Sequence, residues 1–484
     1  MRRPPASPVR ARRPRASPRP APTWVQDTNN STVPTFLVCA LFISLIVPPY
    51  FDYGSLNTES QAAAATSQNL WNKVIWIALL VGSVYFIGRR PALWREVLRR
   101  INPFYLGYIA LATLSVAWSI EPGATIPRVF RLLVTLLCFT AFTLSNWRAD
   151  RFQSLVRTLL GTVLVGSVIF ALVAPHYGIQ EFQDFAAAVP GRLTRSSALL
   201  PTIRPVLRGL TFGKNQMGQL ASLGVIFWFH AWLEKSTKTL WILMCGGASV
   251  ICLYWAHSST SIIAAAFSIP LMLMLRHWPK WLRRFMPYIL VTFSLFMLGY
   301  SLVVLKLIPQ LDFLLTPITA ITGKDLTFSD RTAIWKIIID HIVANPLLGS
   351  GYSAYWVDEP GSPSQAFKTL LDFWPGESHN GYLEVLNDLG AVGGLCLLGF
   401  LFTYLRQSIK IMGFDRQQGS LYVVLLFHQF WSSLAESHWF GVDSLSFAVI
   451  TLAVCTSART LVQRGFEVSA GRPPAYTRAT TSTA

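Results

Sequence analysis

The sequence predicts an all-α, polytopic membrane protein with about 12 transmembrane helices and a large extracytoplasmic loop that contains short amphipathic helices. Of its 484 residues, 52% are hydrophobic and only 13% are charged, whereas soluble proteins average about 25% charged residues. The chain also has 17 Trp, 15 Tyr and 31 Phe, side chains that favour the two interfaces of a bilayer. Finally, apolar stretches of about 20 residues, the length that a spanning helix needs, recur along the chain.

Twelve apolar segments are predicted to cross the membrane, and a basic, Pro-rich leader (1–33) precedes them. We expect the leader to be disordered because it has almost nothing to bury, and no cleavage site for a signal peptide stands out. The predicted spans are 34–50, 71–88, 103–119, 127–145, 157–175, 216–233, 240–256, 261–275, 287–307, 384–405, 420–437 and 443–460.

Lys and Arg residues are concentrated in alternate loops, which predicts the orientation of the chain. The basic loops are 89–100, 146–157, 234–238, 276–284 and 406–416, whereas 52–70, 120–125, 257–260 and 438–442 contain neither residue. Because basic loops stay on the cytoplasmic side, both termini are predicted to be cytoplasmic. The net charge of +18 is then a topology signal with membrane lipids as its partner, not nucleic acid.

This orientation divides the chain into predicted regions. The first nine spans occupy 34–307 and include an outer loop at 176–215. A large extracytoplasmic loop covers 308–383, three further spans cover 384–460, and a cytoplasmic tail covers 461–484.

The outer loop ends in "RGLTFGKNQ", which contains two cations, two glycines and two amides just before a membrane helix. Glycines let backbone amides approach a ligand closely, and a helix N-terminus favours anions. We therefore expect Arg208, Lys214 and Asn215 to bind an anion. The alternative is interfacial snorkelling of Arg208 and Lys214.

The large loop contains "FSDRTAIWKIIIDHIVANPLLGSGYSAYW" (328–356). Isoleucines at helical spacing predict an amphipathic helix that begins after Ser329 or Asp330 and ends before Pro346. Arg331 and Trp335 share one face of this helix. Arginine matches phosphate oxygens and is unfavourable at a helix start, which favours a bound anion over a solvated side chain.

The stretch "SHNGYLEVLNDLG" (378–390) places His379 in a turn before the tenth predicted span. At a helix N-terminus the dipole disfavours the imidazolium, so we expect a neutral ring that accepts a proton. The alternative is a histidine that only helps to cap the helix. Glu436 and His438, near the outer end of the eleventh span, are weaker candidates.

The chain shows no DxD, HExxH or Cys/His cluster, and no glycine pattern of a nucleotide-binding loop. None of its six cysteines forms a CxxC pair, and all lie in apolar stretches. We therefore expect no metal, no cofactor and no disulfide framework.

Three stretches, "RGLTFGKNQMGQLASLG", "DRTAIWKIIIDHIVANPLLGSGYSAYW" and "SHNGYLEVLNDLGAVGG", together resemble the O-antigen ligase and polysaccharide polymerase superfamily of bacterial membrane proteins. The resemblance covers roughly 190–400, and its closest likeness is to the exopolysaccharide-polymerising branch.

This resemblance implies an enzyme that transfers glycan from a polyprenyl-diphosphate-linked oligosaccharide to a sugar hydroxyl, with inversion and without a metal, on the outer face of the membrane. It implies catalytic roles for Arg208, Arg331 and His379: the two arginines would hold the diphosphate, and His379 would act as general base or orient the diphosphate. Among substrate-binding candidates, Lys214, Asn215 and Asn380 are polar. Trp335 and Tyr382 are expected to stack on sugar rings.

Two alternatives remain open at this point. One is a ligase that passes the finished glycan to a lipid A core or a protein, and the other is a transporter of lipid-linked sugar or a small solute. Polysaccharide export proteins are candidate partners of a polymerase. The sugar, its linkage and the oligomeric state do not follow from the sequence.

Overall fold

The computed structural model describes residues 31–47, 70–145, 147–182, 204–277, 331–359, 361–371 and 374–469, together with the isolated residues 285, 288 and 292. The predicted span 287–307 lies outside these residues, apart from two of the isolated positions. Most of the leader, the end of the tail, and residues 308–330 of the large loop also lie outside the described part of the chain.

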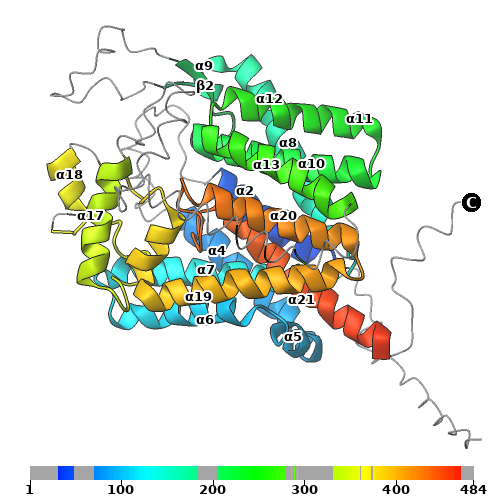
Figure 1. Ribbon diagram of the computed structural model, residues 1–484, viewed down its shortest axis with the longest axis horizontal. Helices are drawn as coiled ribbons and strands as arrows, with labels where there is room; N and C mark the ends of the chain where they lie inside the picture. Colours follow the sequence, from blue (N-terminus) through cyan, green and yellow to red (C-terminus); the bar gives the residue numbers. More distant parts are fainter. Residues whose placement is uncertain are drawn as a thin grey trace, which may run out of the picture.

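The described chain is a bundle of helices (Figure 1). Every predicted span other than 287–307 coincides with a helix, because each apolar segment forms its backbone hydrogen bonds within itself. The bundle helices are α2 (Val33–Ile46), α4 (Leu70–Gly88), α6 (Pro103–Leu114), α7 (Pro122–Leu144), α8 (Arg151–Val173), α10 (Lys214–Glu234), α11 (Thr239–Trp241), α12 (Gly247–Trp255), α13 (Ser259–His277), α19 (Gly381–Met412), α20 (Arg416–Ser432) and α21 (Leu445–Ser469). A 3₁₀ turn (Ser115–Ala117) extends α6, and a π-helical segment (Ile242–Gly246) joins α11 to α12.

Six of the described helices, namely α4, α7, α8, α13, α19 and α21, are long and apolar enough to cross a membrane. Three further apolar segments are shorter: Val33–Ile46, Pro103–Ala117 and Thr239–Trp255. The protein is therefore a mostly helical membrane protein, and the full number of 12 spans stays a prediction.

Three contacts join helix ends that the charge pattern predicts to lie on the same side of the membrane. Arg90 donates to the carbonyl of Leu144 (2.5 Å), and Arg276 pairs with Glu234 (2.6 Å), both between segments predicted to be cytoplasmic. Gln216 donates to the carbonyl of Leu45 (3.0 Å), between segments predicted to be extracytoplasmic. The orientation of the chain in the membrane stays a prediction.

Helix α21 is the centre of the bundle. Its apolar stretch is wholly buried within the protein, and it contacts α7, α19 and α20 (Figure 1). Beside it, the rings of Tyr108 and Phe440 stack with centroids 3.5 Å apart. This packing fixes the loop between α20 and α21, which carries several polar side chains.

The large loop contains two described helices, α17 (Arg331–Ala344) and α18 (Gln365–Leu371). Helix α17 confirms the predicted amphipathic helix and its end before Pro346. Its apolar face is buried in a cluster of its own, where Ile334, Trp335 and Ile338 pack against Tyr355, Trp356 and Phe367.

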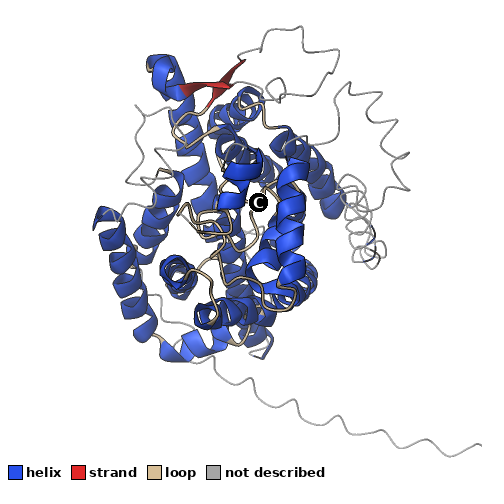
Figure 2. Cartoon of the chain, turned by 90° about the vertical axis from the view of Figure 1, so that its left-hand side faces the viewer, coloured by secondary structure: helices blue, strands red, loops and turns tan. Residues whose placement is uncertain are grey.

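Two short helices and one pair of strands in the loops were not predicted. Helix α5 (Pro91–Leu98) follows α4, and helix α9 (Pro175–Gly178) follows α8. Strands β1 (Ile179–Phe182) and β2 (Arg204–Leu207) form an antiparallel pair, with Ile179 opposite Leu207 (Figure 2). Strands of four residues are too short to show a recognisable alternating pattern in the sequence, so they were not predicted.

Candidate functional site

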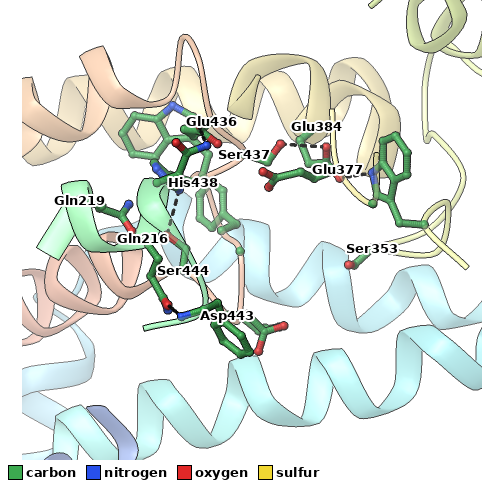
Figure 3. Close-up of a pocket in the computed structure, with 18 of the residues that line it drawn as sticks. Gln216, Gln219, Ser353, Glu377, Glu384, Glu436, Ser437, His438, Asp443 and Ser444 are labelled. Carbon is green, nitrogen blue, oxygen red and sulfur yellow. Dashed lines mark hydrogen bonds between the residues drawn. The ribbon is translucent and has the colours of Figure 1, made fainter. Parts of the chain in front are cut away.

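A cavity of about 640 Å³ opens among the helix ends on the side of the bundle that carries the large loop. Its walls come from the first residues of α7, α10 and α19, and from the loop between α20 and α21. Figure 3 shows Glu384 and Ser353 on one side of this cavity and Gln216 and Gln219 on the other. Segments that are far apart in the sequence therefore meet at one polar hollow.

An ion cluster stands beside the cavity and joins two predicted catalytic residues. Arg331 Nη2 lies 3.0 Å from Glu436 Oε1, and Arg331 Nη1 donates to the carbonyl of Ala435. His379 Nδ1 lies 3.3 Å from Glu436 Oε2 and 2.9 Å from Glu377 Oε1. The site thus brings Arg331 and His379 to opposite oxygens of a single carboxylate.

The charges of this cluster set the protonation of His379. Burial lowers the pKa of His379, but Glu377 and Glu436 outweigh burial and raise this pKa to about 10. Burial likewise raises the pKa of Glu436, yet His379 and Arg331 lower it to about 2. The neutral ring expected from the helix dipole is therefore wrong, because two nearby carboxylates act more strongly than the partial charge of a helix end.

Glu377, His379 and Glu436 are also the one group of possible metal ligands among the described residues, with ligand atoms within 4.8 Å of one another. A metal requires a neutral imidazole and unpaired carboxylates. Here Glu377 and Glu436 raise the pKa of His379, which favours its protonated form, and Arg331 pairs with Glu436. The cluster therefore fits an internal ion network better than a cation site.

The turn that carries His379 is held rigidly. His379 has a φ of 51°, in the left-handed region that a side chain rarely adopts. The Asn380 N–H donates to Ser378 Oγ (3.2 Å), and Trp335 Nε1 donates to the Ser378 carbonyl (2.9 Å). Asn380 then caps α19 by accepting from the N–H groups of Tyr382 (3.0 Å) and Leu383 (3.2 Å). Strain of this kind persists where the surroundings over-determine the backbone, which is common at functional sites.

A second carboxylate, Glu384, anchors the same turn from the first turn of α19. Its Oε2 accepts from the Ser378 N–H (3.0 Å) and from Ser437 Oγ (3.2 Å). Its Oε1 accepts from Trp356 Nε1 (2.6 Å). Glu384 therefore connects the His379 turn to the α20–α21 loop and to the loop that follows α17 (Figure 3).

The structure separates the three basic or amide candidates of the first outer loop. Asn215 Nδ2 donates to Glu436 Oε1 (3.0 Å), so it joins the ion cluster, and Lys214 lines the cavity at the start of α10. Arg208 is only 2% exposed, and its Nη2 donates to the Tyr177 carbonyl (2.8 Å) beside the strand pair. Neither Arg208 nor the ion-cluster residues Arg331 and His379 are among the described residues that line the cavity.

Three other candidate residues make hydrogen bonds that stabilise the fold around the site. Trp335 is not among the described residues that line the cavity, and its Nε1 donates to the Ser378 carbonyl (2.9 Å). The Tyr382 hydroxyl donates to the Phe430 carbonyl (3.0 Å) between α19 and α20. The side-chain oxygen of Asn380 accepts the hydrogen bonds that cap α19. The aromatic side chains that do line the cavity include Tyr352, Trp356 and Trp439.

Sequence reasoning missed or undervalued the acidic part of the site. Glu377 precedes His379 by two residues and Glu384 follows it by five, and neither was predicted as a site residue. Glu436 and His438 were predicted only as weaker candidates. His438 lines the cavity, and burial lowers its pKa. The available signal was a polar stretch, "AESHWFGVDS" (435–444), between two apolar helices.

Two comparisons with known proteins found similarity to this chain. Residues 243–398 match a family model described as O-antigen ligase, and this region contains Arg331 and His379. The chain is also 25% identical over 323 residues to the exopolysaccharide production protein ExoQ of Rhizobium meliloti. That alignment covers 65% of this chain and 67% of the relative. With its apolar helices, the chain is therefore similar to the O-antigen ligase family over part of its length and to an exopolysaccharide production protein over about two thirds of it.

Proposed function

We propose that this protein polymerises glycan on the outer face of the bacterial inner membrane. The donor is a polyprenyl-diphosphate-linked oligosaccharide, the acceptor is a sugar hydroxyl, and the transfer inverts the anomeric centre. The observation that carries this proposal is the cluster of Arg331, His379 and Glu436 beside a polar cavity at one end of a membrane bundle.

The diphosphate binds at the cationic side of the site. The guanidinium of Arg331 has five N–H donors. Some of them donate to the Ala435 carbonyl and to Glu436. His379 is an imidazolium whose Nδ1 is held by carboxylates, so its Nε2–H is directed to a phosphate oxygen of the donor. Lys214 adds a third positive charge at the cavity wall. These donors stabilise the charge that develops on the leaving diphosphate.

Because His379 is already protonated, another group takes the proton of the acceptor hydroxyl. His438 fits this role: it lines the cavity two residues from Glu436, and its lowered pKa keeps the ring neutral. The acceptor oxygen then bonds to the anomeric carbon as the bond to the diphosphate breaks. In this scheme His379 orients the diphosphate, and Arg208 supports the outer loop from a distance.

A ligase is the second candidate, because the matching family is described as O-antigen ligase. A ligase and a polymerase share the donor site and differ in what receives the glycan. The similarity to an exopolysaccharide production protein favours growth of the glycan itself over transfer to a lipid A core or a protein.

The test uses purified protein in liposomes, supplied with a polyprenyl-diphosphate oligosaccharide, with and without lipid A core. A ladder of products from the donor alone is the expected result. A single product that requires the added core would replace polymerase by ligase.

Matched variants locate the chemistry in the same assay. Arg331→Ala and His379→Ala are expected to abolish the ladder, because removing a donor from a developing negative charge costs about 100-fold or more in rate. Arg99→Ala is the control, because Arg99 pairs only with Glu96 in an exposed contact. A ladder that survives both site substitutions would place the chemistry elsewhere.

A further inference from the structure

The cavity has an acidic wall that the diphosphate chemistry does not use. Helix α19 presents Glu384 and Asp388 to the cavity, four residues apart and therefore on one face. Ser353 and Trp356, from the loop after α17, line the same wall. Arg128 of α7 holds that loop by donating to the carbonyls of Ser353 and Trp356 (3.3 Å for the latter).

The two carboxylates of this wall differ in how they are satisfied. Both oxygens of Glu384 accept hydrogen bonds within the protein, so Glu384 serves the fold. Asp388 is 4% exposed and the Ser353 backbone hydrogen-bonds its carboxylate, but Oδ1 has no hydrogen-bond partner among the described residues. A buried carboxylate oxygen without a partner is costly, and an ionisable group on an apolar membrane helix commonly marks a functional site.

The chemistry of the wall selects the kind of group that satisfies Asp388. The unpartnered Oδ1 of Asp388 can accept a hydrogen bond from the hydroxyl of a neutral ligand. Fixed aromatic side chains stand nearby: Trp356 is held by Glu384 (2.6 Å), and the Tyr352 hydroxyl donates to the Phe440 carbonyl (2.6 Å). Apolar rings with a few placed polar groups are typical of a pocket for a small ligand.

We propose that the wall formed by Asp388, Ser353, Trp356 and Tyr352 is a sugar subsite, in which Asp388 Oδ1 accepts a hydrogen bond from a hydroxyl of the glycan. The ion cluster of Arg331 and His379 beside the cavity then takes the diphosphate, and the wall that contains Asp388 takes a neutral sugar ring. This subsite rests on the proposed glycan transfer for its ligand class, but its binding can be measured without any transfer.

The experiment measures binding of a water-soluble probe to the full-length protein in detergent. The probe is the reducing oligosaccharide that mild acid releases from the lipid-linked glycan of the source cell. Titration calorimetry compares the wild type with Asp388→Asn, which keeps the shape of the side chain and replaces one carboxyl oxygen by an amide group. We expect Asp388→Asn to weaken binding about tenfold, which corresponds to one hydrogen bond. Asp358→Asn is the control, because Asp358 forms an exposed pair with Lys368 outside the cavity.

Deoxygenated probes separate recognition from a structural role of Asp388. If Asp388 binds a hydroxyl, one monodeoxy oligosaccharide loses affinity for the wild type but not for Asp388→Asn, so the two changes are not additive. Additive losses for every monodeoxy probe, or unchanged affinity of Asp388→Asn, would overturn the subsite.

Turnover then identifies which glycan uses the subsite. A raised KM for the lipid-linked donor in Asp388→Asn assigns the wall to the donor sugar, and a raised KM for the acceptor assigns it to the acceptor sugar. If the wild type forms no product but binds the probe through Asp388, the proposed transfer fails and the subsite stands.

Discussion

His379 Nδ1 lies 3.3 Å from Glu436 Oε2, and this contact joins the turn before α19 to the loop between α20 and α21. Arg331 Nη2 contacts the other oxygen of the same carboxylate at 3.0 Å. Glu436 therefore holds two positive groups from different segments at a fixed separation. A single carboxylate that places two cations is a simple way to prepare a site for a diphosphate.

Replacing Glu436 by Gln is expected to destabilise the protein, because it leaves Arg331 and His379 close together without their shared anion. Removing one member of a buried charge cluster costs roughly 3 kcal/mol. Thermal unfolding in detergent measures the loss, with Asp358→Asn as the control for an exposed pair, which is worth at most about 1 kcal/mol. Equal melting temperatures for the two variants would show that the cluster is not coupled through Glu436.

The dependence of the transfer rate on pH distinguishes the two roles considered for His379. With its pKa raised to about 10, an imidazolium that binds diphosphate is active at neutral pH and loses its charge as the pH approaches 10. The rate is expected to stay level between pH 7 and pH 9 and to fall above that range. If His379 were instead the general base, the rate would rise toward pH 10, since only then would the neutral ring accumulate.

The same pKa predicts how stability depends on pH. The folded-state pKa of about 10 exceeds the usual value of about 6.5 in an unfolded chain. Protonated His379 therefore contributes stability that is complete below pH 6.5 and is lost as the pH rises through 10. The difference in melting temperature between wild type and His379→Gln should be large at pH 6 and should shrink by pH 10. A difference that grows over this interval would mean that the ring is neutral in the fold.

Trp335 is predicted to position His379 and not to touch the sugar. Trp335→Phe keeps the buried aromatic ring but removes the hydrogen bond to the Ser378 carbonyl. We expect kcat to fall about tenfold, the scale of one hydrogen bond of about 1.4 kcal/mol, with the KM of the donor unchanged. Trp241→Phe is a suitable control, because Trp241 is 51% exposed on α11. A raised donor KM with normal kcat would instead return Trp335 to a binding role.

Much of the fold follows from one local property of the sequence. An apolar segment in a membrane satisfies its backbone only as a helix, so hydropathy alone located the long helices of the bundle, with ends that differ from the predicted bounds by up to nine residues. The positions of Arg331 and His379 also followed from local signals, a helix start and a capped turn. Their approach to each other did not, because it depends on Glu436, which is 105 residues from Arg331 in sequence.

The acidic half of the site was hidden for the same reason. A carboxylate in a loop near a membrane helix is ordinary in isolation, and only packing shows that Glu384 is fully satisfied whereas Asp388 Oδ1 is not. The neutral form expected for His379 failed because the sequence revealed the helix end but not that Glu377 Oε1 lies 2.9 Å from the ring. Charge pairs between distant segments have no fixed spacing in the sequence, whereas membrane spans and helix caps do.

The transfer is predicted to proceed without a divalent cation, even though Glu377, His379 and Glu436 have the donor types of a metal site. A metal must first displace the proton of His379, which at pH 7 costs about 4 kcal/mol for a pKa of about 10, and it must also tolerate Arg331 at 3.0 Å from Glu436. Purified protein treated with EDTA and checked for residual metal is therefore expected to keep most of its activity. The opposite result would be a loss of activity that Mg²⁺ or Mn²⁺ restores in the wild type but not in Glu377→Gln. That result would show that this cluster is a metal site.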